Sequence, residues 1–173
     1  MAIGDTVISP ISVYSKQLKN ISDIKEGGTI AVPNDASNES RALYVLKSAG
    51  LIKLDVSGQT LATVKDITSN PKNLVIKELD ASQTARALDS VDAAVINNNY
   101  AVTAGLKKSA IFTEPVNKDS QQWINIIVAN KKDENNTVYK DVVKAYETEA
   151  TKKTIAKAYP DKSTIPAWGL KLK

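Results

Sequence analysis

The chain has 173 residues, 42% of them hydrophobic and 24% charged, which suits a folded protein of one domain or two small lobes. Its net charge of +4 comes from lysines scattered among acids, without a cluster of five basic residues, so no nucleic-acid partner is expected. Cysteine and histidine are both absent, which excludes disulfides, thiol catalysis and the commonest general base and metal ligand. We therefore expect no metal site, no cofactor and no enzyme.

The first third of the chain predicts a crossing segment, a strand and a helix. Residues 6–14 are rich in β-formers interrupted by Pro10, as in a strand that passes between two lobes, and 18–23 favour a short helical turn. Residues 30–33 form an apolar strand, followed by a polar turn with several N-cap candidates. The next helix ends at Gly50 and places its apolar residues on one face: Ala42, Leu43, Val45, Leu46 and Ala49.

The rest of the chain continues this alternation. Further extended segments are predicted at 61–64, 74–79, 92–97, 110–113 and 123–129, the last as a strand covered on both faces. Further helices are predicted at 83–88 with Ser82 as its cap, at 100–106, and over 137–159 with a break near 148–151. Strands and helices alternating at this spacing predict an α/β fold with a mixed, mostly parallel sheet and C-terminal helices.

Four polar residues are expected near the carboxyl ends of these strands, where α/β folds bind ligands: Asn38, Arg41, Asn97 and Asn125. Arg41 lies in the first turn of a helix and has a guanidinium suited to a carboxylate, although a structural turn with a surface arginine is an equal alternative. Asn125 is an amide within an apolar run, where burial without a partner costs about 1–3 kcal/mol. A local backbone hydrogen bond is its alternative role, and a simple turn is the alternative for residues 97–99.

Several stretches of the sequence resemble the methionine-binding lipoproteins of bacterial ABC importers, and they follow one another in the same order and spacing. They are Pro33–Asp35 through Asn38, Arg41–Leu43, Gly50–Leu54, Asn70–Leu74, Ala93–Asn97 with Tyr100–Ala101, Trp123–Val128 and Ile165–Trp168. The resemblance implies a type II-like periplasmic-binding-protein lobe. It also implies that Arg41 binds the carboxylate of an amino acid while Asn97 and Asn125 hold its polar α-carbon groups. Asn38 matches the ligand-binding residues of the family less closely.

The resemblance further implies that the sequence lacks most of the first lobe of this family. Residues 1–18 are then a strand and crossover from that lobe, 19–121 the second lobe, and 122–173 a strand and helices that return to the first lobe. The sequence shows neither a signal peptide nor the lipidated cysteine that anchors the family outside the cytoplasm at the cell membrane. Half of the binding cleft is expected to be absent.

The leading interpretation is therefore a fragment of a solute-binding protein that takes methionine and serves a membrane permease. The first alternative is a folded lobe without ligand binding that self-associates, as a homodimer formed by exchange of the segment after Asn125. The second is an α/β enzyme that uses Asp35 or Glu39 as a base, which the absence of histidine, phosphate loops and clustered carboxylates disfavours. The sequence does not distinguish L-methionine, D-methionine and a methionine-containing peptide.

Overall fold

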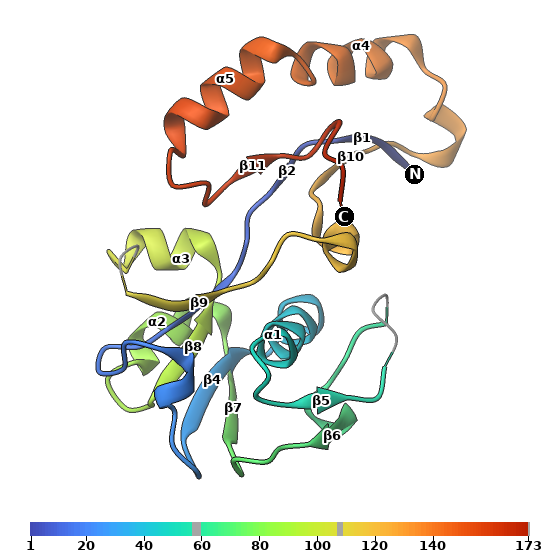
Figure 1. Cartoon of the computed structure of the whole chain (residues 1–173). Coiled ribbons are helices and arrows are strands. Elements are labelled where there is room, and N and C mark those ends of the chain that lie inside the picture. Colours follow the sequence, from blue (N-terminus) through green and yellow to red (C-terminus); the bar gives the residue numbers. More distant parts are fainter. Residues whose placement is uncertain (57–59, 107–108, 173) are drawn as a thin grey trace. The chain divides into compact units, whose positions relative to one another are not determined.

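The structure is a computed structural model that describes residues 1–56, 60–106 and 109–172, and it divides the chain into two units (Figure 1). One unit, called the sheet unit here, is Ile11–Pro115. The other, called the terminal unit, combines Met1–Pro10 with the residues from Val116 onward. The chain therefore passes between the units twice, after Pro10 and after Pro115.

The sheet unit is built on a five-stranded sheet. Its strands are, in spatial order, β7 (Val75–Leu79), β4 (Thr29–Pro33), β8 (Ala93–Ile96), β3 (Ser12–Tyr14) and β9 (Ala110–Thr113). β4 runs parallel to both β7 and β8, whereas β3 runs antiparallel to both β8 and β9. The expected α/β fold with a mixed sheet is confirmed, and its parallel pairings are those of the central strand β4.

Helices cover both faces of this sheet. Successive residues of a strand point to opposite faces, so Ile30, Val32 and Val95 pack in one apolar cluster with the buried side of α1 (Ala36–Ser48). The alternate residues, together with α2 (Thr84–Ala87) and α3 (Asn98–Thr103), form the other cluster, which includes Ala31, Ala94, Ile96, Leu88 and Ala101. Burial on both faces explains why β4 and β8 are almost continuously apolar.

The ends of the helices follow from a few side chains. The Asp35 carboxylate accepts the backbone N–H of Asn38 and so caps α1, while Gly50 follows the helix with a φ of 74°, a conformation that favours glycine. The prediction that Ser82 caps the next helix is wrong. A 3-10 turn, Ala81–Gln83, precedes α2, and the carboxylate of Asp80 caps that turn by accepting the N–H of Ser82 at 2.9 Å.

Smaller elements complete the sheet unit. β5 (Lys53–Leu54) and β6 (Ile67–Ser69) form an antiparallel pair. Single 3-10 turns lie at Ile21–Asp23, within the helical turn expected at 18–23, and at Val64–Asp66.

The terminal unit contains two antiparallel strand pairs and two helices. β1 (Ala2–Asp5) pairs with β10 (Ile126–Val128), and β2 (Val7–Ile8) pairs with β11 (Ile165–Pro166). The predicted helical tail is confirmed as α4 (Thr137–Tyr146) and α5 (Glu149–Ala158), with Thr148 capping α5 at the expected break. Short 3-10 turns lie at Lys118–Trp123 and Lys131–Asp133. A Cβ on Gly4 would lie only 2.6 Å from Cγ1 of Val143, so a glycine is what lets β1 approach α4 this closely.

The prediction of a strand covered on both faces at 123–129 is wrong. Only Ile126–Val128 is a strand, and its two outer residues are exposed, Ile126 at 47% and Val128 at 66% of their surface. In the described part of the terminal unit, β10 has one neighbouring strand, β1, and no second layer covers its outward side chains. The apolar character of this run is therefore not matched by burial.

Candidate ligand-binding site

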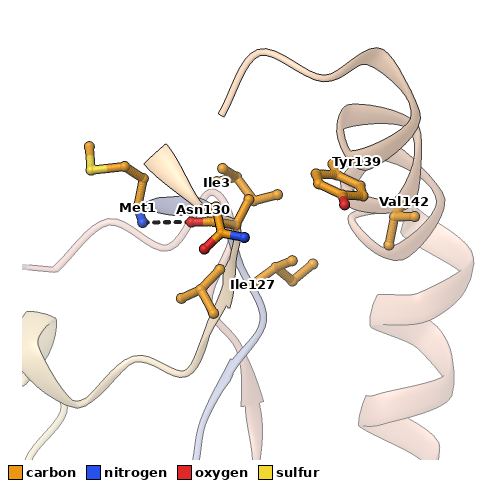
Figure 2. Close-up of a pocket in the computed structure, with 8 residues that line it drawn as sticks. Met1, Ile3, Ile127, Asn130, Tyr139 and Val142 are labelled. Atoms are coloured by element: carbon orange, nitrogen blue, oxygen red, sulfur yellow. Dashed lines mark hydrogen bonds between the residues drawn. The ribbon is translucent and has the colours of Figure 1, made fainter. Parts of the chain in front are cut away.

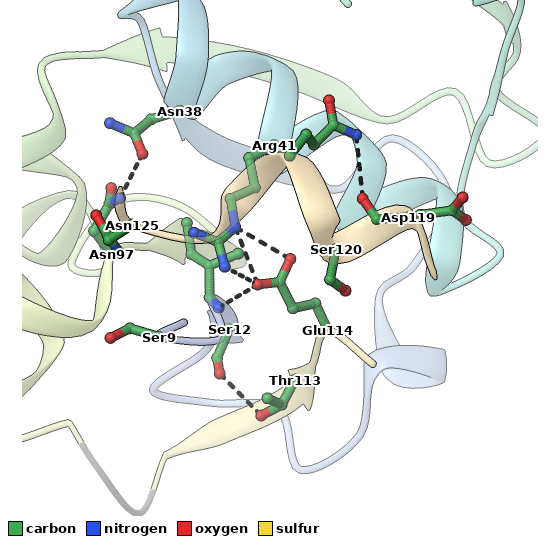
Figure 3. A network of polar contacts seen from close by, with 12 residues as sticks. Ser9, Ser12, Asn38, Arg41, Asn97, Thr113, Glu114, Asp119, Ser120 and Asn125 are labelled. Carbon is green, nitrogen blue, oxygen red and sulfur yellow. Dashed lines mark hydrogen bonds and ion pairs between the residues drawn. The ribbon is translucent and has the colours of Figure 1, made fainter. Parts of the chain in front are cut away.

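The candidate site in the sheet unit forms where β4 and β8 end. These two strands are parallel neighbours, so their carboxyl ends lie at the same edge of the sheet. α1 begins just after β4, and Asn97 follows β8 directly. As a result, Nδ2 of Asn97 donates a hydrogen bond of 2.7 Å to Oδ1 of Asn38, although 59 residues separate them (Figure 3).

The first turn of α1 holds Asn38 in place through Asp35. The Asn38 side-chain amide donates to both carboxylate oxygens of Asp35, at 3.0 and 3.1 Å, and the Ser37 hydroxyl donates to one of them. Burial alone would raise the pKa of Asp35, but the hydrogen bonds from Asn38 and Ser37 outweigh it and hold the pKa below its usual value. Asp35 is therefore an ionised group that accepts hydrogen bonds and donates none.

The orientation of both amides follows from that carboxylate. The end of Asn38 that faces Asp35 must be its NH₂ group, so the end that faces Asn97 is its oxygen, and Asn97 must in turn present its own NH₂ group there. This leaves Oδ1 of Asn97, which is buried and has no hydrogen-bond partner in the part of the chain that the structure describes. A buried acceptor left without a donor costs free energy, so this atom is suited to a ligand that donates.

Arg41 lies one helical turn after Asn38 and points from α1 toward Glu114 (Figure 3). Its Nε donates to Oε1 and Oε2 of Glu114 at 3.0 and 3.3 Å, and its Nη2 donates to Oε1. Both side chains are nearly buried, Arg41 with 11% and Glu114 with 8% of its surface exposed. The guanidinium is thus already paired within the sheet unit.

Glu114 is anchored independently of Arg41 and is the main residue that sequence reasoning missed. Its Oε1 accepts the backbone N–H of Ile11 at 2.9 Å, and its own N–H donates to the carbonyl of Ile11 at 3.1 Å. A hydrogen bond between the hydroxyls of Ser12 and Thr113 fixes the same strand ends. The available signal was a lone acid at the end of the predicted strand 110–113, in a chain with only two arginines.

Asn125 belongs to the terminal unit, and its described contacts lie there. Its backbone N–H and its side-chain Nδ2 both donate to the carbonyl of Val7, at 2.9 and 3.2 Å, while its own carbonyl accepts from Thr6. The residue is exposed, so the burial expected for it within an apolar run is not found. The local backbone hydrogen bond weighed as its alternative role is present.

The terminal unit contains an open pocket of its own, of about 490 Å³ (Figure 2). Most of its lining is apolar: Met1, Ile3, Ile127, Val128, Ala129, Asn130, Tyr139 and Val142. The backbone carbonyl of Ala129 in this lining already accepts the terminal ammonium of Met1, at 2.8 Å. The pocket therefore offers apolar surface rather than a set of convergent polar groups.

The described residues, which leave out 57–59, 107–108 and 173, contain no group of three or more acidic, histidine or cysteine residues placed to hold a metal ion. None of their helices is long and apolar enough to cross a membrane.

Comparison with known proteins places this arrangement in a family. The model of the NlpA lipoproteins matches residues 1–168 of the chain. The chain belongs to the NlpA lipoprotein family. NlpA proteins are solute-binding lipoproteins of transporters rather than enzymes, so the alternative of an enzyme with Asp35 or Glu39 as its base is set aside. Asp35 caps a helix, and the buried Glu39 accepts the N–H of Val64.

Individual NlpA relatives agree with this assignment. The probable D-methionine-binding lipoprotein MetQ of Pasteurella multocida is 47% identical over 85% of the chain and 53% of its own length. The solved substrate-binding protein of a methionine transporter from Streptococcus pneumoniae is 52% identical, with a TM-score of 0.84 over 97% of this chain and 68% of that one. A nutrient-binding protein from Burkholderia cenocepacia, solved bound to methionine, is 44% identical with a TM-score of 0.85, over 96% and 70% of the two chains.

The chain is short compared with these NlpA relatives. It spans between 53% and 60% of the length of the curated relatives described as probable D-methionine-binding lipoproteins in Pasteurella multocida, Haemophilus influenzae and Vibrio cholerae. The activities and partners of the full-length relatives are therefore only proposed for this chain.

Proposed function

We propose that the chain is part of the solute-binding component of an ABC importer and that its ligand is an amino acid, methionine. The observation that carries this proposal is the 44% identity, over 96% of the chain, to a protein solved with methionine bound. The partner is then the membrane permease of the importer, and the full-length protein works outside the cytoplasm, anchored by a lipid. In this proposal the second lobe is the sheet unit, Ile11–Pro115, in place of the expected 19–121, because Ser12–Tyr14 is a strand of its sheet, and the terminal unit belongs to the first lobe.

The groups gathered at the end of β4 and β8 support an amino-acid ligand. A free amino acid presents a carboxylate and an ammonium, which need donors and acceptors respectively. We assign the carboxylate to Arg41, whose guanidinium has five N–H donors and is held in place by Glu114, and the ammonium to the unpaired acceptor Oδ1 of Asn97. Asn38 acts indirectly by holding Asn97, and Asn125 is proposed to hold the α-carbon groups from the terminal unit.

The test of this proposal is the substitution Arg41→Ala in the complete protein, followed by calorimetry with methionine. Charge-assisted hydrogen bonds to a carboxylate contribute about 1.5–3 kcal/mol, so the substitution should weaken binding by roughly ten- to a hundred-fold or more. Arg41→Lys should restore little of the affinity, because lysine lacks the planar guanidinium that binds a carboxylate with two parallel hydrogen bonds. The matched control is Arg86→Ala, which removes the other, exposed arginine and should leave affinity unchanged. An unchanged dissociation constant for Arg41→Ala contradicts the assignment.

The 173-residue chain alone should bind methionine weakly, because residues that enclose the ligand side chain are proposed to lie in the part of the relatives that this chain does not span. An unburied methionine side chain forfeits on the order of 2 kcal/mol. Calorimetry with L-methionine, D-methionine and a methionine-containing dipeptide would rank the three candidate ligands. Submicromolar binding by this chain would show that its cleft is complete.

A second candidate role, self-association as a homodimer, rests on the terminal unit. Val128 is 66% exposed and Val142 is 54% exposed, beside a strand pair whose described outer edges have no partner. Such apolar edges are templates for another chain, and exchange of the segment after Asn125 between two copies would cover them. In the structure this segment pairs with β1 and β2 of its own chain.

Light scattering at several concentrations tests the self-association. We expect the apparent mass to rise with concentration and Val142→Lys to suppress that rise. The control is Val102→Lys, which places the same charge at an exposed valine of α3 in the sheet unit and should have no effect. A concentration-independent monomer contradicts the proposal.

A further inference from the structure

The contacts at the start of α1 form a chain from a charged group to an unpaired acceptor. Asp35 accepts the amide of Asn38, Asn38 accepts the amide of Asn97, and Oδ1 of Asn97 remains buried without a partner in the described residues. Each step has a single orientation, because a carboxylate only accepts and an amide donates at one end and accepts at the other. We call the hydrogen-bonded side chains of Asp35, Asn38 and Asn97 the relay. The negative charge of Asp35 sets the donor-to-acceptor direction of each hydrogen bond in it.

We propose that Asp35, acting through Asn38, holds Asn97 with its oxygen toward the ligand, so that the site selects an amino acid whose α-amino group is free to donate. This inference rests on the proposed function, because it specifies which part of the ligand Asn97 recognises. Asp35 is a positioning residue here, and it need not touch the ligand. An amide turned the other way would present NH₂ to an ammonium, and two donors would then face each other.

The relay also explains why these residue types are needed together. An asparagine at position 97 held by water alone is free to turn either end toward a ligand, since its two ends are nearly the same shape. The carboxylate of Asp35 removes that freedom, because it fixes the orientation of the Asn38 amide, which in turn fixes the orientation of the Asn97 amide. Its other role, capping α1 by accepting the N–H of Asn38 at 3.1 Å, requires only an oxygen and is separable from the relay.

The decisive substitution is Asp35→Asn, because asparagine caps helices about as well as aspartate but has an end that donates. The cap of α1 is expected to survive, while the amides of Asn38 and Asn97 lose the acceptor-only group that fixes their direction. The matched control is Asp80→Asn, the same change at a second capping aspartate, whose carboxylate accepts from Ser82.

Two probes are titrated into the full chain and followed by NMR, which detects millimolar binding: methionine and 4-(methylthio)butanoate, which is methionine without its amino group. In the wild-type chain methionine should bind at least about tenfold more tightly than the analogue. Asp35→Asn should abolish that preference by weakening methionine binding about tenfold while changing the analogue less than about twofold. Asp80→Asn should keep the wild-type preference.

A second readout needs no ligand. Hydrogen exchange of the Asn97 side-chain NH₂ should be slow in the wild type, where it donates to Asn38, and faster in Asp35→Asn. Equal weakening of both probes, or unchanged exchange at Asn97, would overturn the relay. If the wild-type chain shows no response to methionine at all, the proposal that this chain binds methionine weakly fails instead, and the exchange rates alone decide whether Asp35 orients Asn97.

Discussion

The two units of this chain differ in how completely they bury their apolar side chains and pair their charged ones. In the sheet unit, the three inner strands β4, β8 and β3 are covered on both faces, and an arginine and a glutamate are buried together. In the terminal unit, two strand pairs and two helices leave several large apolar side chains exposed, and its described ion pairs lie on exposed helix surfaces. The sheet unit therefore buries its apolar and charged groups against one another, whereas the terminal unit leaves apolar surface exposed.

The largest expected difference concerns the ion pairs. Glu114→Gln would leave the guanidinium of Arg41 buried without its countercharge, which costs about 3–5 kcal/mol of unfolding free energy. The matched change in the terminal unit is Asp141→Asn, which removes the exposed partner of Lys144 and should cost less than about 1 kcal/mol. Urea unfolding of the two variants measures both values. Equal losses would mean that the Arg41–Glu114 pair is solvated in solution.

A smaller difference is expected for two isoleucines in strands. Ile30 in β4 is fully buried, so Ile30→Ala should lower the free energy of unfolding by about 2–5 kcal/mol through lost burial and a cavity. Ile126 in β10 is 47% exposed, so Ile126→Ala should cost less than about 1 kcal/mol. The same urea unfolding experiment compares them. A large loss for Ile126→Ala would show that β10 is covered in solution, as self-association predicts.

The contrast between the units also explains what the sequence revealed. Apolar periodicity located β4, α1, β7 and β8, because in the sheet unit each apolar face meets another within the same hundred residues. The same reasoning failed for residues 123–129, where an apolar run predicted a covering layer on each face and the described chain leaves Ile126 and Val128 exposed. An apolar pattern indicates that a segment is suited to packing against apolar surface. It does not indicate whether that surface is present in the same chain.

The candidate site was predicted in part for a similar reason. The positions of Asn38, Arg41 and Asn97 could be predicted because strand ends and a helix start are local features, whereas the binding role of these residues stays a prediction. Glu114 was missed because its role depends on Arg41, which is 73 residues away in the sequence, and on a backbone contact with Ile11. The role of Asp35 beyond capping was likewise hidden, since it depends on the long-range contact between Asn38 and Asn97.

The smallest expected effect, and one confined to the sheet unit, is a pH dependence with opposite signs at two neighbouring acids. Burial raises the pKa of Glu39, and the nearby acids Glu78, Asp35 and Asp66 add to this, although the N–H of Val64 opposes it. A raised pKa in the folded state means that the neutral acid is favoured there. Its contribution to stability is complete below the unfolded-state pKa, near 4.5, and is lost as the pH rises through the folded-state pKa.

Asp66 behaves in the opposite way, because hydrogen bonds from the N–H and the hydroxyl of Thr63 lower its pKa. Its contribution is present above the unfolded-state pKa, near 3.8, and is lost as the pH falls through the lower folded-state value. Glu39→Gln should therefore stabilise the protein more at pH 7 than at pH 4, whereas Asp66→Asn should destabilise it more at pH 7 than at pH 3. Urea unfolding across this range measures both slopes, and slopes of the same sign would show that the carboxyl of Glu39 is exposed to water in solution.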